Sequence, residues 1–408
     1  MSVGVQTFRG ERLKEARLAR GLFKKSLADM VGITGTAITR YEEGQDKPQH
    51  DRLVALAAHL NFPFEFFLRP EWPERLETVL WRSRAAETKH AREMTEQRMR
   101  WLCEVFHFLE QEVNFPNYAL PELDLPSDFR LISPERIELA ALELRRAWGL
   151  RESPIPDVIL ALENAGLPVV TLEISSDKQD GFFFTSASLA RSFVGINVYN
   201  VSAARARFDA GHELGHAVLH RHVTAQQSRD PGLHKIMEQQ AHRFAGAFLF
   251  PKDAFLREVG AVSLDYFSAL KKRWGMSIAA MIFRAFDLGL IDEFEKATLQ
   301  QNMGRRRWRG PLREPFDSPS EMPLERPRML RRGVETVLKE NTFGRPALRA
   351  ALALPSRELE QLAGLDDGFF NAADPVPFEV SLKRDRGLRA IDLESGNVLE
   401  FPRRRQQQ

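Results

Sequence analysis

The chain has 408 residues, with 58 Lys and Arg against 56 Asp and Glu, so its formal net charge is only +2. This length allows two or three domains with separate cores, and any contact with nucleic acid must come from a local basic patch. The single cysteine, Cys103, excludes an intrachain disulfide framework and a cysteine-rich zinc finger, and it fits a reducing compartment.

The sequence contains no pattern typical of secretion or of a membrane span. The N-terminus lacks the basic and then apolar run of a signal peptide, and no apolar run approaches the roughly 20 residues of a spanning helix. Charged residues make up 28% of the chain and apolar residues 43%, which is ordinary for a folded soluble protein. We therefore expect a folded, cytoplasmic protein with no membrane partner.

Changes in hydrophobic pattern and in proline content predict the organisation of the chain. Helical spacing dominates, and the apolar runs at 167–174, 181–188 and 192–199 are typical of strands, so the predicted fold class is mainly α with a small β-sheet. We expect five regions: an all-α module at 1–70, a helical connector at 71–130, an α+β domain at 131–303, a proline-rich linker at 304–327, and a small helical region with a basic tail at 328–408.

Residues 13–48 have the spacing of three short helices around one small core. Gly32 lies between a helix that ends at Val31 and one that Thr34 would cap, where a tight turn needs a residue tolerant of positive φ. This corner is typical of a helix-turn-helix, whose following helix enters the major groove. The side chains that we expect at DNA are small, hydroxyl-bearing or cationic, namely Lys24, Lys25, Thr34, Thr36, Thr39 and Arg40.

A helical bundle with incidental basic residues would show the same spacing. The segment, however, resembles the Xre (Cro/C1-type) repressor family over nearly its full domain, including the ending at Tyr41, Glu42, Gly44, Lys47 and Pro48. The resemblance implies binding to a double-stranded DNA operator, and a buried ion pair between Arg17 and Glu42. Where the family usually begins its second helix with Thr-Gln, this chain has Phe23 and Lys24, so Lys24 takes the place of the contact-forming glutamine.

A dense group of histidines marks residues 212–242, which contain six of the ten in the chain. His212 and His216 stand at i and i+4, so on a helix they share one face and can converge on a single ion. Glu213 lies beside them, where it can take a proton from water on the metal without binding the metal. This His-Glu-x-x-His pattern is typical of a zinc hydrolase, although two surface histidines on an amphipathic helix would have the same spacing.

The flanking sequence favours a packed helix with an active site. Residues 203–219 are helix-forming and carry the apolar side chains of Phe208, Leu214 and Val218. The strand candidate at 192–199 immediately precedes this helix. We predict it to be the edge strand on which such peptidases align an extended substrate.

The third metal ligand must come from the sequence after the motif. His222 has the spacing of the metzincin pattern, but that pattern needs glycine where Leu219 stands, to turn the third histidine inward. Glu238, on a following helix, is the better candidate. His242 lies one turn beyond Glu238, where it would support a ligand or bind the metal in place of Glu238. Two histidines and one glutamate leave a fourth position for water, which is typical of a catalytic zinc.

The segments RFDAGHELGHAVLH and EQQAHRFAGAFLFP resemble the ImmA/IrrE metallopeptidase family, and with residues 271–291 the resemblance covers roughly 130–310. It implies a zincin-like α+β domain that holds Zn²⁺, or Mn²⁺ in its place, and hydrolyses peptide bonds with Glu213 as the general base. The family usually has Asn or Asp where His242 stands. Relatives cut helix-turn-helix repressors, so the implied substrate is a repressor-type protein or this protein itself.

Three further hypotheses concern function and assembly. Metal binding does not prove turnover, so the alternative function is a transcription factor whose zinc domain is a non-proteolytic sensor or interaction module. Xre domains usually bind two-fold sites, so we expect a homodimer, with the helices of 73–113 as the contact. An oxyanion donor should exist, and Tyr199 and His234 are candidates that the sequence does not separate.

Overall fold

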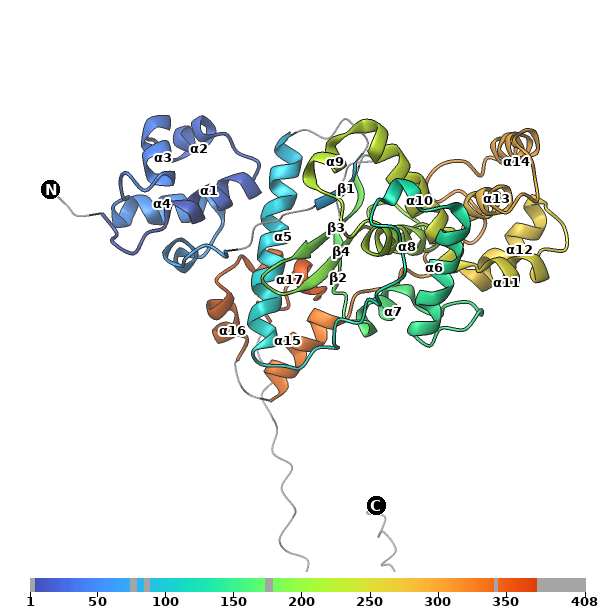
Figure 1. Ribbon diagram of the computed structural model, residues 1–408. Helices are drawn as coiled ribbons and strands as arrows, with labels where there is room; N and C mark the ends of the chain where they lie inside the picture. The colour runs from blue at the N-terminus through green and yellow to red at the C-terminus, as the bar shows by residue number, and fades with distance from the viewer. Residues whose placement is uncertain (1–3, 74–78, 84–88, 173–178, 341–343, 373–408) are drawn as a thin grey trace, which may run out of the picture. The chain divides into compact units, whose positions relative to one another are not determined.

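The computed structural model is mainly helical with one four-stranded sheet, as the sequence predicts (Figure 1). The structure describes residues 4–73, 79–83, 89–172, 179–340 and 344–372. These ranges belong to one compact unit. Among the described helices, none is both long enough and apolar enough to cross a bilayer.

The N-terminal module is all-helical and contains the predicted corner. Its elements are α1 (Gly10–Ala19), α2 (Lys24–Val31), α3 (Gly35–Glu42), α4 (His50–Leu60) and the 3₁₀ helix η1 (Phe64–Leu68). Gly32 ends α2 in the left-handed conformation, with φ of +68°, and the Thr34 side chain accepts a hydrogen bond from the backbone N–H of Ala37 at the start of α3. Both features confirm the helix-turn-helix corner predicted from the sequence.

The sequence predicts a helical connector at 71–130, but the described part of it also contains a strand. A short strand, β1 (Val79–Ser83), precedes the long helix α5 (Lys89–Glu110). β1 pairs antiparallel with a strand far along the chain. Local spacing could not reveal this strand, because its conformation depends on a distant partner.

The sheet has the strand order β1-β3-β4-β2. Its other strands are β2 (Val169–Leu172), β3 (Gln179–Ser186) and β4 (Arg191–Asn197). β3 runs antiparallel to β1 and β4, and β2 runs parallel to β4. The prediction that the strand just before the histidine helix is an edge strand is therefore wrong, because β4 is hydrogen-bonded on both sides.

Side chains alternate between the two faces of the sheet, and each face has its own core. Phe183 and Val194 join the core of the histidine-bearing helices, whereas Phe182 and Phe193 join a second core. Helices α5 and α15–α17 line this second core; the C-terminal three are α15 (Met329–Lys339), α16 (Arg345–Leu352) and α17 (Ser356–Ala363). The described part of the C-terminal region therefore covers the sheet.

The apolar side of α5 is used inside the chain. Trp101, Cys103 and Phe106 are fully buried, and Trp101 packs edge-on against Phe62 and Phe66. The apolar face of α5 is therefore packed within the chain. The expectation that the helices of 73–113 form the contact between two copies stays a prediction, and it would have to use another face of α5.

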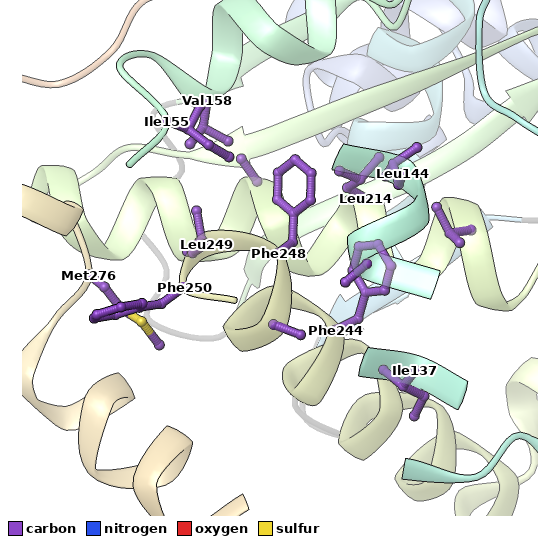
Figure 2. Close-up of a cluster of buried hydrophobic side chains, with 14 of the residues drawn as sticks. Ile137, Leu144, Ile155, Val158, Leu214, Phe244, Phe248, Leu249, Phe250 and Met276 are labelled. Carbon is purple, nitrogen blue, oxygen red and sulfur yellow. The ribbon is translucent and has the colours of Figure 1, made fainter. Parts of the chain in front are cut away.

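Nine helices of the described chain lie on the other side of the sheet or beyond it: α6 (Pro134–Ala147), α7 (Val158–Asn164), α8 (Ala203–Leu219), α9 (Ala225–Arg229), α10 (Pro231–Leu249), α11 (Lys252–Glu258), α12 (Leu264–Trp274), α13 (Ile278–Asp287) and α14 (Glu293–Arg305). Figure 2 shows part of their core, where Leu214 of α8 lies among Leu144 of α6 and Phe244 and Phe248 of α10. This core holds α8 and α10 in place.

The proline-rich segment before α15 is bound to these helices rather than free. Glu314 accepts hydrogen bonds from the first backbone N–H groups of α13, and Glu325 accepts from those of α7. Glu314 and Asp317 also pair with Lys271, whose side chain is fully buried. Carboxylates at helix N-termini satisfy donors that the helix leaves unpaired. The segment 304–327, called the strap below, is therefore tied to the N-termini of α7 and α13.

Candidate metal centre

The candidate site forms where α8 and α10 pack closely. Small residues face each other there: a methyl group added to Gly215 would lie 3.1 Å from Ala241 Cα, and one added to Gly211 would lie 3.5 Å from Ala245 Cα. Ser202 caps α8 by accepting from the backbone N–H of Arg205. Glycine and alanine at the crossing let the two backbones approach, so that polar side chains on neighbouring positions of both helices meet.

Three predicted residues converge at this crossing. The Nε2 atoms of His212 and His216 lie 3.0 Å apart. Glu238 Oε2 lies 3.5 Å from His212 Nε2, and Glu238 Oε1 lies 3.2 Å from His216 Nε2. In a tetrahedral zinc site with bonds of about 2.0–2.1 Å, the ligand atoms lie roughly 3.3 Å apart. The donor types and their spacing therefore fit a zinc ion.

Burial and charge favour an ionised Glu238 beside the histidines. His212 and His216 are buried, whereas Glu238 is partly exposed and opens the site toward solvent. Partial burial of Glu238 works against its charged form, but hydrogen bonds with His212 and His216 outweigh this, and the pKa of Glu238 is lowered. An ionised carboxylate is the form that binds a metal.

Glu213 is fully buried between α8 and the sheet. A methyl group added to Gly181 of β3 would lie only 2.8 Å from Glu213 Oε1 and 2.8 Å from the backbone oxygen of Gly195. Only glycine leaves room at this position, so β3 passes directly over the glutamate. The structure thus places the Glu213 carboxylate against β3, the strand that pairs with β1.

The remaining histidines near the motif separate into different environments. His242 lies with its ring 4.6 Å from that of His212, and His212, Glu238 and His242 offer ligand atoms within 4.8 Å of one another. His234 Nε2 lies 4.0 Å from Glu238 Oε1. His222 is exposed in the turn after α8, as the rejection of the metzincin pattern requires.

The oxyanion candidates differ in position. His234 stands one turn before Glu238 on α10 and reaches the site. Tyr199 is 49% exposed in the loop after β4, and no contact between Tyr199 and the candidate ligands is found among the described residues. His234 is therefore the better placed of the two.

Sequence analysis missed two polar residues next to the site, His220 and Gln240. His216 Nδ1 lies 2.9 Å from His220 Nδ1, and His220 Nε2 lies 2.9 Å from Gln240 Oε1. Burial, and then the neighbouring His216, lowers the pKa of His220 to about 3, so the ring is neutral. The spacing of His220, four residues after His216, would have indicated a contact on the same helix face.

A cavity of about 560 Å³ lies next to His242. Phe208 of α8, Ile236 of α10 and Phe283 of α13 contribute apolar side chains to its wall, and Arg205 contributes a cationic one. The ring of Phe208 lies 5.7 Å from that of His242. A largely apolar space therefore adjoins His242, but His212, His216 and Glu238 do not line it.

The predicted DNA-contact residues fall into two groups. Thr36 and Arg40 are exposed one turn apart on α3, Lys25 is exposed on α2, and Arg40 approaches Asp46 at 3.4 Å. Lys24 Nζ instead lies 3.2 Å from Thr39 Oγ1, which also bonds to the backbone of Gly35. The first group is exposed, whereas Lys24 and Thr39 are half-buried in contacts within the module. Thr34, the sixth predicted residue, is exposed and caps α3.

The predicted ion pair between Arg17 and Glu42 is confirmed. Arg17 Nε and Nη2 donate to the two oxygens of Glu42 at 2.5 and 3.0 Å, and both side chains are buried. Lys24 Nζ lies 3.7 Å from Glu42 as well. A bidentate pair of this kind joins α1 to α3.

The fold and the site together define a helix-turn-helix protein with a metallopeptidase-type domain. Residues 13–67 match the helix-turn-helix family model, in agreement with the Xre-type resemblance. Residues 162–286 match a peptidase family described as the IrrE N-terminal-like domain. The chain therefore carries an Xre-type DNA-binding domain and an IrrE-like domain, as the sequence motifs predicted.

Curated relatives match the N-terminal module. An uncharacterized HTH-type transcriptional regulator of Bacillus subtilis (strain 168), YqaE, is 32% identical over 66 residues, which is 16% of this chain and 57% of the relative. The SPbeta prophage-derived uncharacterized HTH-type transcriptional regulator YonR of the same strain is 35% identical over 60 residues, 15% of this chain and 56% of the relative. The chain thus spans somewhat more than half of each relative.

Proposed function

We propose that this protein is a DNA-binding transcriptional regulator whose IrrE-like domain is a zinc-dependent endopeptidase. The observation that supports hydrolysis most directly is the convergence of His212, His216 and Glu238 within 3.0–3.5 Å, with Glu213 buried next to them. Three protein ligands leave a position open, which is typical of catalytic rather than structural zinc. Mn²⁺ would suit the same donors. DNA as a partner implies that the protein acts in the cytoplasm.

The roles of the side chains follow from their positions. His212, His216 and Glu238 would hold the metal, which when bound supplies a Lewis acid that lowers the pKa of water and polarises a carbonyl. Glu213 accepts the proton of the attacking water on a carboxylate oxygen and then gives it to the leaving amine. His234 donates a hydrogen bond to the developing oxyanion. The apolar cavity beside His242 receives a side chain of the substrate.

The proposed substrate is a helix-turn-helix repressor or this protein itself. Family resemblance supports the first. The position of β1 supports the second, because β1 adds to the edge of β3, the strand that covers Glu213. The register pairs Trp81 with Phe182, the neighbour of Gly181. Addition of an extended segment to a sheet edge is a common way to bind a peptide, and here the segment belongs to the connector of the same chain.

The test compares the wild type with Glu213→Gln after incubation with Zn²⁺ or Mn²⁺, alone and with candidate repressors encoded by neighbouring genes. We expect the wild type to cut a repressor or its own connector near β1, and the variant to lose at least a hundredfold in rate while it retains equal metal. Mass spectrometry identifies the cut, and metal analysis measures occupancy. Equal cleavage by both proteins, or no metal in either, would contradict the proposal.

A non-proteolytic sensor or interaction module is the second candidate, and His242 is the observation that favours it. If His242 joined the other three ligands, four protein ligands would close the site, as in structural zinc centres. The variant His242→Asn, with the residue that the family resemblance predicts there, separates the two functions. If the domain is an endopeptidase, His242→Asn should cleave at a rate within about tenfold of wild type and should have an unchanged Co²⁺ spectrum. If His242 closes the site as a fourth ligand, the variant should lose metal and its Co²⁺ spectrum should change.

The assembly of the protein is part of the proposal. Two helix-turn-helix modules bound to a two-fold operator require a homodimer. Because the apolar face of α5 is buried within the chain, the dimer would form through another surface or on the DNA itself. Analytical ultracentrifugation with and without operator DNA distinguishes these routes.

A further inference from the structure

His220 and Gln240 lie in a continuous hydrogen-bonded chain that ends on a backbone carbonyl. Gln240 Nε2 donates to the backbone oxygen of Phe129 at 2.7 Å. Gln240 Oε1 lies 2.9 Å from His220 Nε2, and His220 Nδ1 lies 2.9 Å from His216 Nδ1. His216, His220 and Gln240 are all buried, so bulk water does not compete for these bonds.

The carbonyl of Phe129 sets the direction of every bond in this chain. A backbone carbonyl only accepts, so Gln240 must turn its NH₂ group toward Phe129 and its oxygen toward His220. An amide oxygen also only accepts, so His220 must carry its proton on Nε2. The Nδ1 atom of a neutral His220 is then an acceptor, and His216 must donate to it from Nδ1.

The same logic leaves His216 Nε2 without a proton. That atom lies 3.0 Å from His212 Nε2 and 3.2 Å from Glu238 Oε1, so its lone pair is directed at the place where the three candidate ligands converge. In the opposite tautomer, two N–H groups or two lone pairs would face each other between buried residues. Such a mismatch leaves buried polar groups without hydrogen bonds and is therefore unfavourable.

We infer that His220 and Gln240 are positioning residues that hold His216 in the metal-binding tautomer and orientation. The inference rests on the metal centre of the proposed function but not on proteolysis. His220 acts directly on His216, and Gln240 acts through His220. Phe129 lies in the short helix η2 (Phe129–Leu131), before residues 162–286 that match the IrrE-like family model. The row of hydrogen bonds therefore links the candidate metal centre to a segment outside that match.

The experiment measures Zn²⁺ affinity of the full-length protein by competition with a chromogenic chelator. His220→Phe removes the acceptor and keeps a ring of similar size, and we expect the Zn²⁺ dissociation constant to rise about tenfold to a hundredfold. His220→Asn retains an oxygen near the position of Nδ1, so it should restore affinity to within a few-fold of wild type. His222→Phe, at an exposed histidine two residues away, is the matched control and should change nothing.

Three further readings keep the test decisive. Gln240→Leu leaves His220 in place but frees its tautomer, so it should weaken Zn²⁺ binding less than His220→Phe does. The Co²⁺ absorption spectrum should change in His220→Phe and return in His220→Asn, whereas a purely structural role would leave the coordination spectrum unchanged. If His220→Phe is unfolded by circular dichroism, Gln240→Leu and His220→Asn decide the question.

The outcomes distinguish this inference from the proposed function. Wild-type affinity in both His220→Phe and Gln240→Leu would overturn the positioning role while leaving the metal centre intact. Equal loss in His220→Phe and His220→Asn would also overturn it, because the acceptor would then not be the feature that matters. Failure of the wild type to bind Zn²⁺ would instead refute the metal centre itself.

Discussion

The candidate metal centre and helix α3, which is proposed to face DNA, are built in opposite ways. At the candidate metal centre, His212, Glu213 and His216 are buried, and hydrogen bonds run from His216 through His220 and Gln240 to the backbone carbonyl of Phe129. On α3, Thr36 and Arg40 are exposed. A buried polar site must satisfy its own donors and acceptors, whereas an exposed surface leaves them to water until DNA binds.

In one region the residues that stabilise the fold are also those proposed to act, and in the other they are different residues. In the helix-turn-helix module the buried Arg17–Glu42 pair and the Thr34 cap support the fold, and other residues are proposed to contact DNA. At the metal centre, the residues proposed to act are themselves part of the buried packing between α8 and α10. We therefore expect stability and function to separate by mutation in the first region more readily than in the second.

The largest expected effect tests the helix-turn-helix module. Arg17→Leu leaves Glu42 buried without its bidentate partner, which should cost about 3–5 kcal/mol of local stability. Hydrogen exchange of the α1–α4 amides, followed by mass spectrometry, should accelerate more than a hundredfold, while exchange in α8 and α10 stays as in wild type.

The matched control for this change is Arg40→Leu. Arg40 is exposed, and its pairing with Asp46 is exposed too, so its loss should alter stability by less than about 1 kcal/mol. Unchanged exchange in Arg17→Leu would show that the buried pair does not support the module. Accelerated exchange in α8 as well would show that the two regions unfold together, and the comparison would then fail.

Much of both regions could be predicted from the sequence, because their residues are close together along the chain. The corner at Gly32, the cap at Thr34 and the i, i+4 pair of His212 and His216 are local patterns, and periodicity is sufficient to find them. Glu238 required a choice among candidates on a separate helix. The structure brings it within 3.2 Å of His216.

The parts that could not be predicted depend on distant partners. β1 is a strand because β3 pairs with it, and the strap is ordered because Glu314 and Glu325 cap helices far from them in sequence. Proline content alone predicted a linker at 304–327. Gln240 gave no pattern of its own, because its role depends on the carbonyl of Phe129.

The second prediction concerns Gly181 and asks whether the rate of cleavage can fall while the protein keeps its metal. Gly181→Ala would place a methyl group 2.8 Å from Glu213 Oε1 and from the backbone oxygen of Gly195. The strand or the glutamate must move, and a displacement of about 1 Å can cost roughly a hundredfold in rate. Cleavage assays should show this loss at unchanged Zn²⁺ content. Loss of Zn²⁺ in parallel would mean that Glu213 and the ligands cannot be perturbed separately.

The smallest effects come from two threonines that stand two residues apart. Thr34 accepts the backbone N–H of Ala37, so Thr34→Ala should lower the stability of the module by about 1 kcal/mol. Thr36 is exposed on α3, so Thr36→Ala should leave stability within about 0.5 kcal/mol and weaken operator binding instead. Hydrogen exchange of the full chain measures the first quantity, and fluorescence anisotropy with operator DNA measures the second. Because the two side chains are alike, a reversed pattern could not be attributed to residue type. It would mean that the exposed face of α3 is not the DNA-facing surface.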